Sequence, residues 1–516
     1  MTSINSGIKT FEINYNTIKI LRYIFIFYLK MAESHNSIIS FRAEYLISCS
    51  IDSYANLTII ASRVDSEIDV LLSQLQQLIK VPSVSAKKQP TIIKCAELVS
   101  EIMSRSGIST EIIRSEDSSK QIPPVVFGEV KSKSNPNGKT ILFYNHYDVQ
   151  PPEPIELWND DPFSGKIEGN FIFGRGSSDD KGELITRIKA IEYFLKESGD
   201  VPCNVKFLVE GEEEIGSSHL EECLAKNKEK FSCDATIWEF GYVDEDDVPV
   251  MSLGMKGLLC VELHAKCSNA DLHSSLAVIV ENPAWRLVHA LKTIRDENGK
   301  ITIDNWNKDV RDFLPEELEC IGQDEFDISE FKKSYGLNYI FNQEDIEEIK
   351  KALVGGVTSN ISGLFSGYIG EGSKTVLPST AMAKLDFRLV PDMIPQKQFE
   401  LLREHLDKNG FSDIQLNFLS GEPACRIPLN DEFVMLVEAS AKEEYGKVIK
   451  SISSAGTGPM WYFNKILGCP CVSIGCTYKY SRIHSPNEFA RIDLIKKTTK
   501  CIGNIVERYG KITDKN

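Results

Sequence analysis

The sequence predicts an α/β protein in which helices flank a mostly parallel sheet and a second, α+β unit is inserted. Two observations predict this class. From Val64 onward, short apolar runs alternate with amphipathic helical stretches, the pattern of parallel strands joined by crossover helices. After residue 256 the pattern changes to longer strands and an acidic, polar segment. We therefore expect the first unit to comprise residues 64–256 and 427–516, and the inserted unit residues 257–426.

The elements of the first unit follow from the spacing of its apolar residues. One helical face carries Ile68, Leu71, Leu72, Leu75, Leu78 and Ile79, and Pro82 ends that helix. Four later runs are short and apolar, as strands are: "PVVFGEV", "TILFY", "NVKFLVE" and "DATIWEF". Between them, "GELITRIKAIEYFLKES" and "SSHLEECLAKNKEKF" are long enough to be helices.

The inserted unit has fewer recognisable elements. "GLLCVELHAKCS" and "AMAKLDFRLVP" are predicted strands, and a helix is predicted over residues 283–295. The long acidic segment from Asp296 to Lys351 shows no pattern that predicts an element.

Composition limits the partners of the protein. The 516 residues include 58 basic and 74 acidic side chains, a net charge of -16, which disfavours nucleic acid and anionic membrane surfaces. The 13 cysteines are odd in number and form no CxxC pair, as expected of reduced thiols in the cytoplasm. We expect a cytoplasmic protein that binds neither nucleic acid nor membranes.

Residues 1–63 differ from the rest because they carry few charged side chains. The apolar run Ile18 to Leu29 is shorter than the roughly 20 residues of a membrane span and contains Lys19 and Arg22. Met31 offers an alternative start. Three interpretations stay open: a dispensable extension, a packing or interface segment, and a targeting or anchoring segment.

Side chains of the types that bind metals follow five apolar, strand-like runs: "TILFYN", "FIFGRG", "KFLVEG", "ATIWEF" and "CPCVSIG". Ligands of open α/β sheets bind beyond the carboxyl ends of the strands, so these side chains should meet there. Taken singly, each has a simpler explanation: an acidic run is usually a solvated surface, and Asp180 should cap the helix that follows it. Together, such carboxylates repel one another unless cations neutralise them. The side chains are His146, Asp148, Asp179, Asp180, Glu212, Glu213, Glu214, Glu239 and His484.

Two imidazoles and three carboxylates suit two divalent ions of the zinc or manganese type that share one carboxylate and leave a position open for water. Asp148 stands two residues after His146 on an extended chain, so both side chains point to the same side. Asp148 can therefore accept the second N–H of a ligating imidazole and fix its tautomer.

The runs "HYDVQP", "GRGSSDDKG", "EGEEEIGS", "IWEFG" and "HSPNE", in this order, resemble the M20 family of co-catalytic metallopeptidases. That family includes cytosolic dipeptidases, carboxypeptidase G and the amino-acid deacylases, and the resemblance extends from about Val64 to the end of the chain. It implies a metallopeptidase catalytic domain with an inserted lid and dimerisation domain. It also implies two divalent ions per subunit, with zinc expected and manganese or cobalt as alternatives.

The resemblance implies a role for each ligand. Asp179 bridges the two ions, with His146 and Glu239 completing one site and Glu214 and His484 the other. Glu213 is implied as the general base. The family pattern of two glutamates, one residue and Gly-Ser selects Glu213 and Glu214 from the three adjacent glutamates.

The inserted unit resembles the family's lid. "NADLHSS" places His273 where related enzymes reach into the partner subunit and stabilise the oxyanion, which implies a homodimer formed through the lid. "NISGL", "KTVLP" and "FRLVP" nominate Asn360, Thr375 and Arg388 for substrate binding. Arg388 suits a substrate carboxylate, although an ordinary sheet-edge salt bridge stays an alternative for it.

The expected function is metal-dependent hydrolysis of the amide bond of dipeptides or similar small peptides. The alternative is an N-acyl-amino-acid deacylase of the acetylornithine deacetylase or succinyl-diaminopimelate desuccinylase type. Glu239 stands where dipeptidases resembling carnosinase carry Asp, and "SSAGTGPMWYF" differs from the Gly-Gly-Thr-Asp run of many deacylases. A silent family member is disfavoured because no ligand or base is missing, and a phosphate-binding protein because "GRGSSDDKG" lacks the Lys-Ser/Thr ending.

Overall fold

The structure is a computed structural model that describes residues 60–87, 90–116, 121–323, 326–341 and 345–512. The extension predicted for residues 1–63 lies outside these ranges except for its last four residues. None of the helices in the described ranges has the length and apolar character needed to cross a bilayer.

The first sheet has six strands in the order β1-β2-β6-β3-β7-β19. The last four of these are mutually parallel, as predicted, whereas β1 pairs with β2 and β2 with β6 in the antiparallel sense. Residues 114–124 join β1 to β2, fewer than the dozen or more residues that a crossover between parallel strands needs, so these two neighbours are antiparallel. Bounds are β1 Ser109–Ile113, β2 Val125–Val130, β3 Thr140–His146, β6 Asn204–Glu210, β7 Ala235–Trp238 and β19 Cys471–Ser473.

Helices cover this sheet and enclose the larger hydrophobic core. α4 packs on β1 and β2, α5 on β3, and α15 on α5 and α13. α3 ends at Ile79, before Pro82 as predicted, whereas the predicted helical run after β6 is divided at Asn227 into α6 and α7. Bounds are α3 Ile68–Ile79, α4 Thr91–Arg105, α5 Lys181–Ser198, α6 Leu220–Lys226, α7 Lys228–Phe231, α13 Glu432–Tyr445, α14 Met460–Tyr462 and α15 Ile492–Tyr509.

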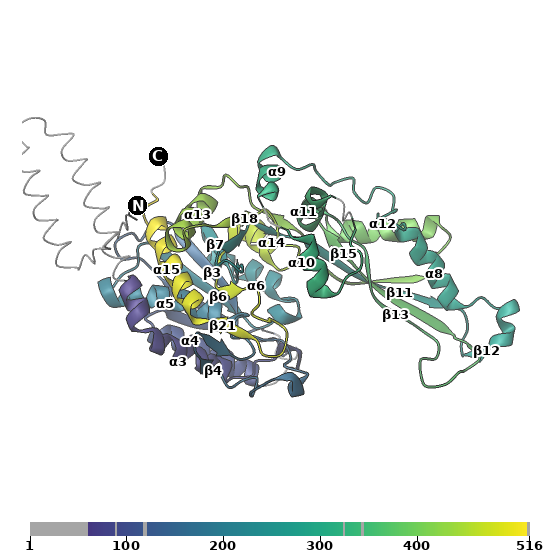
Figure 1. Cartoon of the computed structure of the whole chain (residues 1–516), viewed down its shortest axis with the longest axis horizontal. Helices are drawn as coiled ribbons and strands as arrows, with labels where there is room; N and C mark the ends of the chain where they lie inside the picture. Colours follow the sequence, from purple (N-terminus) through teal and green to yellow (C-terminus); the bar gives the residue numbers. More distant parts are fainter. Residues whose placement is uncertain (1–59, 88–89, 117–120, 324–325, 342–344, 513–516) are drawn as a thin grey trace, which may run out of the picture.

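A second, fully antiparallel sheet has the order β13-β15-β11-β16. α8 and α12 pack on one face of it, and Figure 1 shows this unit at the opposite end of the molecule from β3, β6 and β7. Burial alternates along β11, so that Leu259, Val261 and Leu263 pack against the helices while Leu258 and Cys260 face away. Bounds are β11 Gly257–Lys266, β13 Asn360–Ser366, β15 Thr380–Leu389, β16 Gln415–Glu422, α8 Pro283–Ile294 and α12 Pro395–Lys408.

The chain leaves the first unit through β10 (Gly254–Met255) and returns through β17 (Cys425–Arg426), and these two short strands pair with each other. The pair stands next to the limits of the predicted insertion, residues 257–426. The division into 64–256, 257–426 and 427–516 stays a prediction.

In the described parts of the polar segment 296–351, for which no element was predicted, the chain forms α9 (Pro315–Gly322) and α10 (Ile328–Tyr335), and α11 (Ile346–Gly355) begins there. Asp327 and Asp345 cap the last two by accepting hydrogen bonds from backbone N–H groups of the first turn. Three signals in the sequence were passed over here: the caps, Pro315, and apolar residues at helical spacing such as Ile346, Ile349 and Leu353.

Three smaller sheets complete the fold. One joins β18, β9, β8 and β20, another β21, β5 and β4, and a third β12 and β14. Bounds are β4 Lys166–Glu168, β5 Phe171–Phe173, β8 Tyr242–Val243, β9 Pro249–Ser252, β12 Leu272–His273, β14 Val376–Leu377, β18 Ile449–Ser451, β20 Thr477–Tyr478 and β21 Phe489–Arg491.

Candidate metal centre

The predicted ligands meet at the carboxyl edge of the first sheet. Each comes from the end of a strand or from a loop that follows one, as expected for an α/β sheet. His146 ends β3, Asp179 stands two residues before α5, Glu213 and Glu214 lie in the 3-10 turn η4 (Glu213–Ile215) after β6, Glu239 follows β7, and His484 lies between β20 and β21.

Asp179 lies between the two histidines. Its Oδ1 is 3.0 Å from Nε2 of His146, and its Oδ2 is 3.0 Å from Nε2 of His484. Glu214 Oε2 is 3.1 Å from the same His484 nitrogen, and Glu239 Oε2 is 4.0 Å from the His146 nitrogen. One carboxylate thus offers one oxygen to each of two neighbouring ligand groups, the arrangement that two bridged ions need.

Asp148 contacts both groups. Its Oδ1 is 3.3 Å from Nδ1 of His146, and its backbone oxygen is 3.1 Å from the same nitrogen. Its Oδ2 accepts a 3.1 Å hydrogen bond from the backbone N–H of Glu214. Gln150, which the sequence analysis did not single out, donates from Nε2 to Oε2 of Glu214 at 2.9 Å. These contacts fix the orientation of two ligands.

Asp180 contacts the end of β3 and does not cap α5, contrary to the prediction from the sequence. It stands at the start of α5, but its side chain makes no capping hydrogen bond. Its buried Oδ2 instead accepts from the backbone N–H of His146 at 2.9 Å and from Asn145 at 2.8 Å. His146, Asp180 and Glu239 offer ligand atoms within 4.8 Å of one another, as do His146, Asp179 and Glu214.

Glu488, within the "HSPNE" run, was also missed as a functional residue. It is fully buried and accepts hydrogen bonds from the backbone N–H groups of Gly176, Ser178 and Asp179 at 3.0, 3.0 and 3.1 Å. Arg175 Nη1 pairs with the other side of the same carboxylate at 2.7 Å. Glu488 therefore holds the loop that carries Asp179.

The electrostatics of the cluster suit cations. Burial and the neighbouring carboxylates raise the pKa of Glu213 and Glu239 well above the ordinary range. Asp179 and Glu214 raise the pKa of His484 to about 10, and the two imidazoles lower that of Asp179 despite its burial. Oε2 of Glu239 is buried without a hydrogen-bond donor among the described residues. Carboxylate oxygens and imidazole nitrogens that lie this close together suit zinc or manganese ions.

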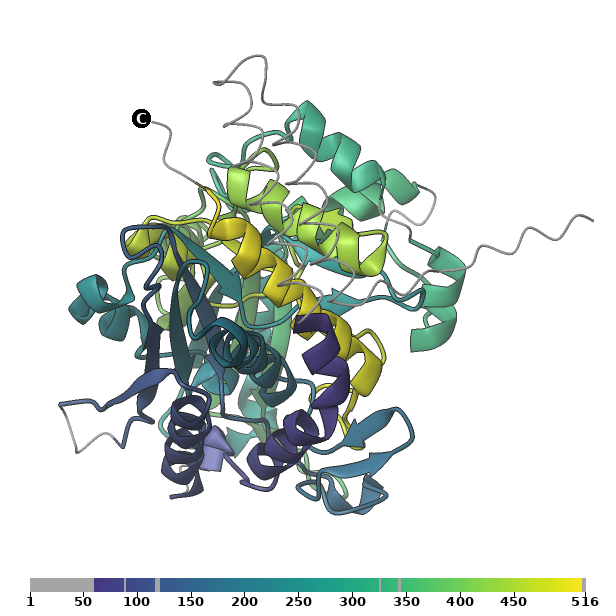
Figure 2. The ribbon, with the colours of Figure 1, turned by 90° about the vertical axis from the view of Figure 1, so that its left-hand side faces the viewer.

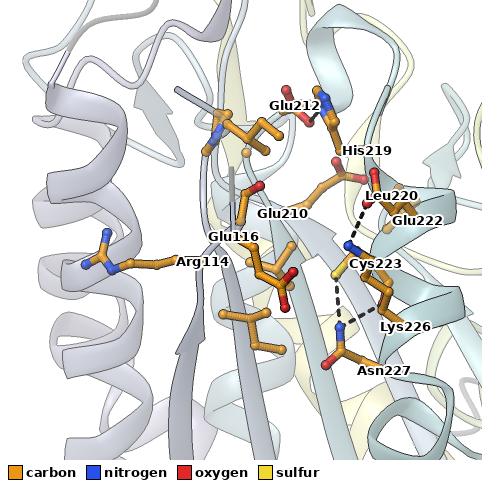
Figure 3. A pocket seen from close by; sticks show the side chains of 16 residues that line it. Arg114, Glu116, Glu210, Glu212, His219, Leu220, Glu222, Cys223, Lys226 and Asn227 are labelled. Carbon is orange, nitrogen blue, oxygen red and sulfur yellow. Dashed lines mark hydrogen bonds and ion pairs between the residues drawn. The ribbon is translucent and has the colours of Figure 1, made fainter. Parts of the chain in front are cut away.

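The three adjacent glutamates point in different directions. Oε2 of Glu212 is 2.8 Å from Nδ1 of His219, and both side chains line a hollow of about 470 Å³ beside α6, together with Glu210 and Cys223 (Figure 3). None of the cluster residues lines this hollow. Glu213 and Glu214 therefore remain as the two glutamates of the cluster, the register that the resemblance implied.

Of the predicted lid residues, Arg388 reaches closest to the first unit. Its Nη1 donates to the hydroxyl of Thr457, and among the described residues it forms no ion pair with a carboxylate. Asn360 is exposed and donates to Asp386 at 3.0 Å. His273 and Thr375 lie on or beside the β12–β14 pair, which Figure 1 shows at the far end of the molecule. A single chain does not bring these last two residues to the cluster.

Comparison with known proteins agrees with this geometry. The sequence pattern described as "Peptidase family M20/M25/M40" matches residues 142–508. A Cys-Gly metallodipeptidase of Candida albicans is 27% identical over 465 residues, which cover 85% of this chain and 94% of that protein.

Two solved structures share the fold. An M20 family metallo-carboxypeptidase from Sulfolobus solfataricus is 39% identical with a TM-score of 0.80, covering 86% of this chain and 99% of its own. The dipeptidase Dug1p from Saccharomyces cerevisiae is 25% identical with a TM-score of 0.76, covering 89% and 99%. The family pattern spans most of the chain and includes every residue of the cluster, so the chain belongs to the peptidase family M20/M25/M40.

Proposed function

We propose that this peptidase hydrolyses the amide bond of dipeptides or similar small peptides with two divalent ions. The observation that supports this most is the Asp179 carboxylate, which presents one oxygen to each histidine. His146, Asp179 and Glu239 would hold one ion, with Asp180 beside them, and Glu214, Asp179 and His484 the other. Zinc is the expected metal, with manganese or cobalt as alternatives.

The bound ions would polarise the scissile carbonyl and lower the pKa of water toward neutrality. Glu213 is the proposed general base: it takes a proton from the attacking water and returns it to the leaving amine. Asp148 orients His146 through the Nδ1 contact.

Substrate recognition is assigned to the second unit. Arg388 would bind the substrate carboxylate, assisted by Asn360 and Thr375. His273 of the partner subunit would stabilise the oxyanion, because His273 of the same chain lies far from the cluster. The proposal therefore requires a homodimer formed through the second unit.

We also propose that the enzyme works in the cytoplasm. None of the cysteines in the described ranges forms a disulfide, and most are buried, as in a reducing compartment. Recovery of the protein in a membrane or secreted fraction of the cell would contradict this.

The test of function is a paired hydrolysis assay on metal-loaded protein. A free dipeptide is compared with an N-acetyl amino acid that has the same C-terminal residue, and a chelator-treated sample serves as the blank. Chelator-sensitive cleavage of the dipeptide is expected. Preferential cleavage of the acetylated compound would make the protein a deacylase instead.

A carboxypeptidase that acts on longer peptides is a second candidate. The 39% identity to a metallo-carboxypeptidase favours it, and Glu239 is the residue more usual in such enzymes. A series of peptides of two to five residues distinguishes the two: a dipeptidase loses kcat/KM sharply beyond two residues, whereas a carboxypeptidase does not.

A further inference from the structure

The second sheet carries two opposite charges on the face that α8 and α12 leave uncovered. Arg388 on β15 and Glu422 on β16 are both register partners of Leu258 on β11. Directly opposite residues of antiparallel strands project to the same face, so both side chains share the face of Leu258, and their Cα atoms are two strand spacings, about 10 Å, apart. Leu259 occupies the covered face.

Glu422 lacks the partner that a buried acid requires. Its Oε1 is buried and has no hydrogen-bond partner among the described residues. Burial and the Glu210 carboxylate raise its pKa to about 8, while Arg388 opposes the shift. A buried carboxylate oxygen without a donor is unfavourable unless a cation or donor completes it.

The cations near Glu422 are engaged elsewhere. Arg388 donates to Thr457. Lys256, which precedes the first residue of β11, donates to the carbonyl oxygens of Ala352 and Gly356 at 3.0 and 2.7 Å. A positive group supplied by the substrate would therefore satisfy Glu422.

We propose that Glu422 is a specificity-determining residue that binds the basic side chain of the substrate's C-terminal residue while Arg388 binds the carboxylate of that residue. The inference rests on the proposed function, in which Arg388 receives the carboxylate. Lysine and arginine combine a long stem with a cationic end, so they can extend from a carboxylate bound at Arg388 on β15 across β11 toward Glu422 on β16.

The test compares two substrates that differ in charge but little in shape, Ala-Arg and Ala-citrulline. We expect the wild-type enzyme to favour Ala-Arg in kcat/KM by about tenfold to hundredfold, as for a charge-assisted hydrogen bond. Glu422→Gln should abolish the preference while leaving kcat/KM for Ala-citrulline unchanged, and Glu422→Lys should reverse it. Glu262→Gln is the matched control, because Glu262 lies on the same face but pairs with His264 and Lys384.

Equal kcat/KM values of the wild-type enzyme for Ala-Arg and Ala-citrulline would overturn the inference. An equal loss of kcat/KM for both substrates in Glu422→Gln would also overturn it. The unfolding temperature of Glu422→Gln should not fall, since Oε1 of Glu422 has no hydrogen-bond partner to lose among the described residues. A lowered temperature with the preference retained would assign Glu422 a structural role.

A binding experiment tests the role of Glu422 even if the proposed function is wrong. If the metal-loaded protein cleaves neither dipeptide, calorimetric binding of free L-arginine against L-citrulline replaces the kinetic test. A preference for arginine that Glu422→Gln removes would support the inference, and equal binding would overturn it.

Discussion

The two sheets place their charged side chains in different ways. At the carboxyl edge of the first sheet, side chains from β3, the β6 and β7 loops and the start of α5 converge into one cluster, in which His146 and Glu239 are buried and His484 is exposed. The second sheet spreads its charges along a face, and the separate β12–β14 pair, which carries His273, lies at the far end of the molecule (Figure 1). Parallel strands bring their carboxyl ends to a common edge, whereas antiparallel strands alternate in direction. Metal binding should thus depend on the first unit and recognition on the second.

Figure 2 shows α15, in yellow, beside the purple helical segment that begins the described chain, where Ile60 lies next to Gly503 of α15. Both α3 and α15 contact α5, and the first turn of α5 follows Asp179 and Asp180. We expect changes in the second unit to leave metal content intact.

The largest effect is expected within the cluster. Glu213→Gln removes the proposed base but keeps the shape of the side chain, so kcat should fall about 100- to 10,000-fold with metal content unchanged. Steady-state kinetics and elemental analysis measure the two quantities. Glu212→Gln is the matched control and should retain activity, because Glu212 pairs with His219 outside the cluster. Normal turnover of the Glu213 variant would exclude it as the base.

A change at the far end of the second unit should also abolish most activity, which would link the two regions through a dimer. His273→Ala should lower kcat about 100- to 1,000-fold, as for loss of an oxyanion donor. Mixing this variant with Glu213→Gln should restore about a quarter of wild-type activity, because half of the dimers become mixed and each mixed dimer has one complete site. No recovery after subunit exchange, or an active monomer in light scattering, would contradict the proposal.

Arg388 should separate recognition from metal binding. Arg388→Lys should raise KM for a free dipeptide about tenfold to hundredfold, because the bidentate contact to the carboxylate is lost. The C-terminal amide of the same dipeptide should be affected little, and metal content should stay at the wild-type value. An equal loss for dipeptide and amide would remove Arg388 from carboxylate binding.

The smallest effect is expected at Glu317 of α9, near the junction of the two units. Glu317 pairs with Arg311 at 2.7 Å and with Arg426 of β17 at 3.4 Å. Glu317→Gln should lower the free energy of unfolding by about 1–3 kcal/mol at pH 7 without changing kcat. Thermal and denaturant unfolding test this.

The effect of Glu317 should depend on pH. Although burial opposes it, the two arginines and the N–H of Leu314 lower the pKa of Glu317 to about 2, from 4.5. A folded-state pKa below the unfolded value stabilises the protein above pH 4.5 and loses that contribution as the pH falls toward 2. The difference in unfolding temperature between wild type and Glu317→Gln should therefore shrink below pH 4.5. A constant difference would mean that the effect is not electrostatic.

The sequence alone determined the chemistry of the cluster and the strands that carry it. Apolar runs precede His146, Glu213, Glu214 and Glu239. The local pattern of residues and the order of the strands therefore predict the edge of the sheet at which these side chains lie. The helices α9, α10 and α11 were missed because each is short and lies in an acidic segment that the sequence analysis did not divide into elements.

Only the tertiary structure decided which of the like residues act together. Glu212 turns to His219, Asp180 contacts the backbone of His146 instead of capping α5, and Glu488 reaches the Asp179 loop from more than 300 positions away. The alignment of Glu422 with Arg388 through Leu258 depends on the register of three strands distant in sequence. Register and side-chain direction result from packing between elements, and no local pattern of residues encodes them.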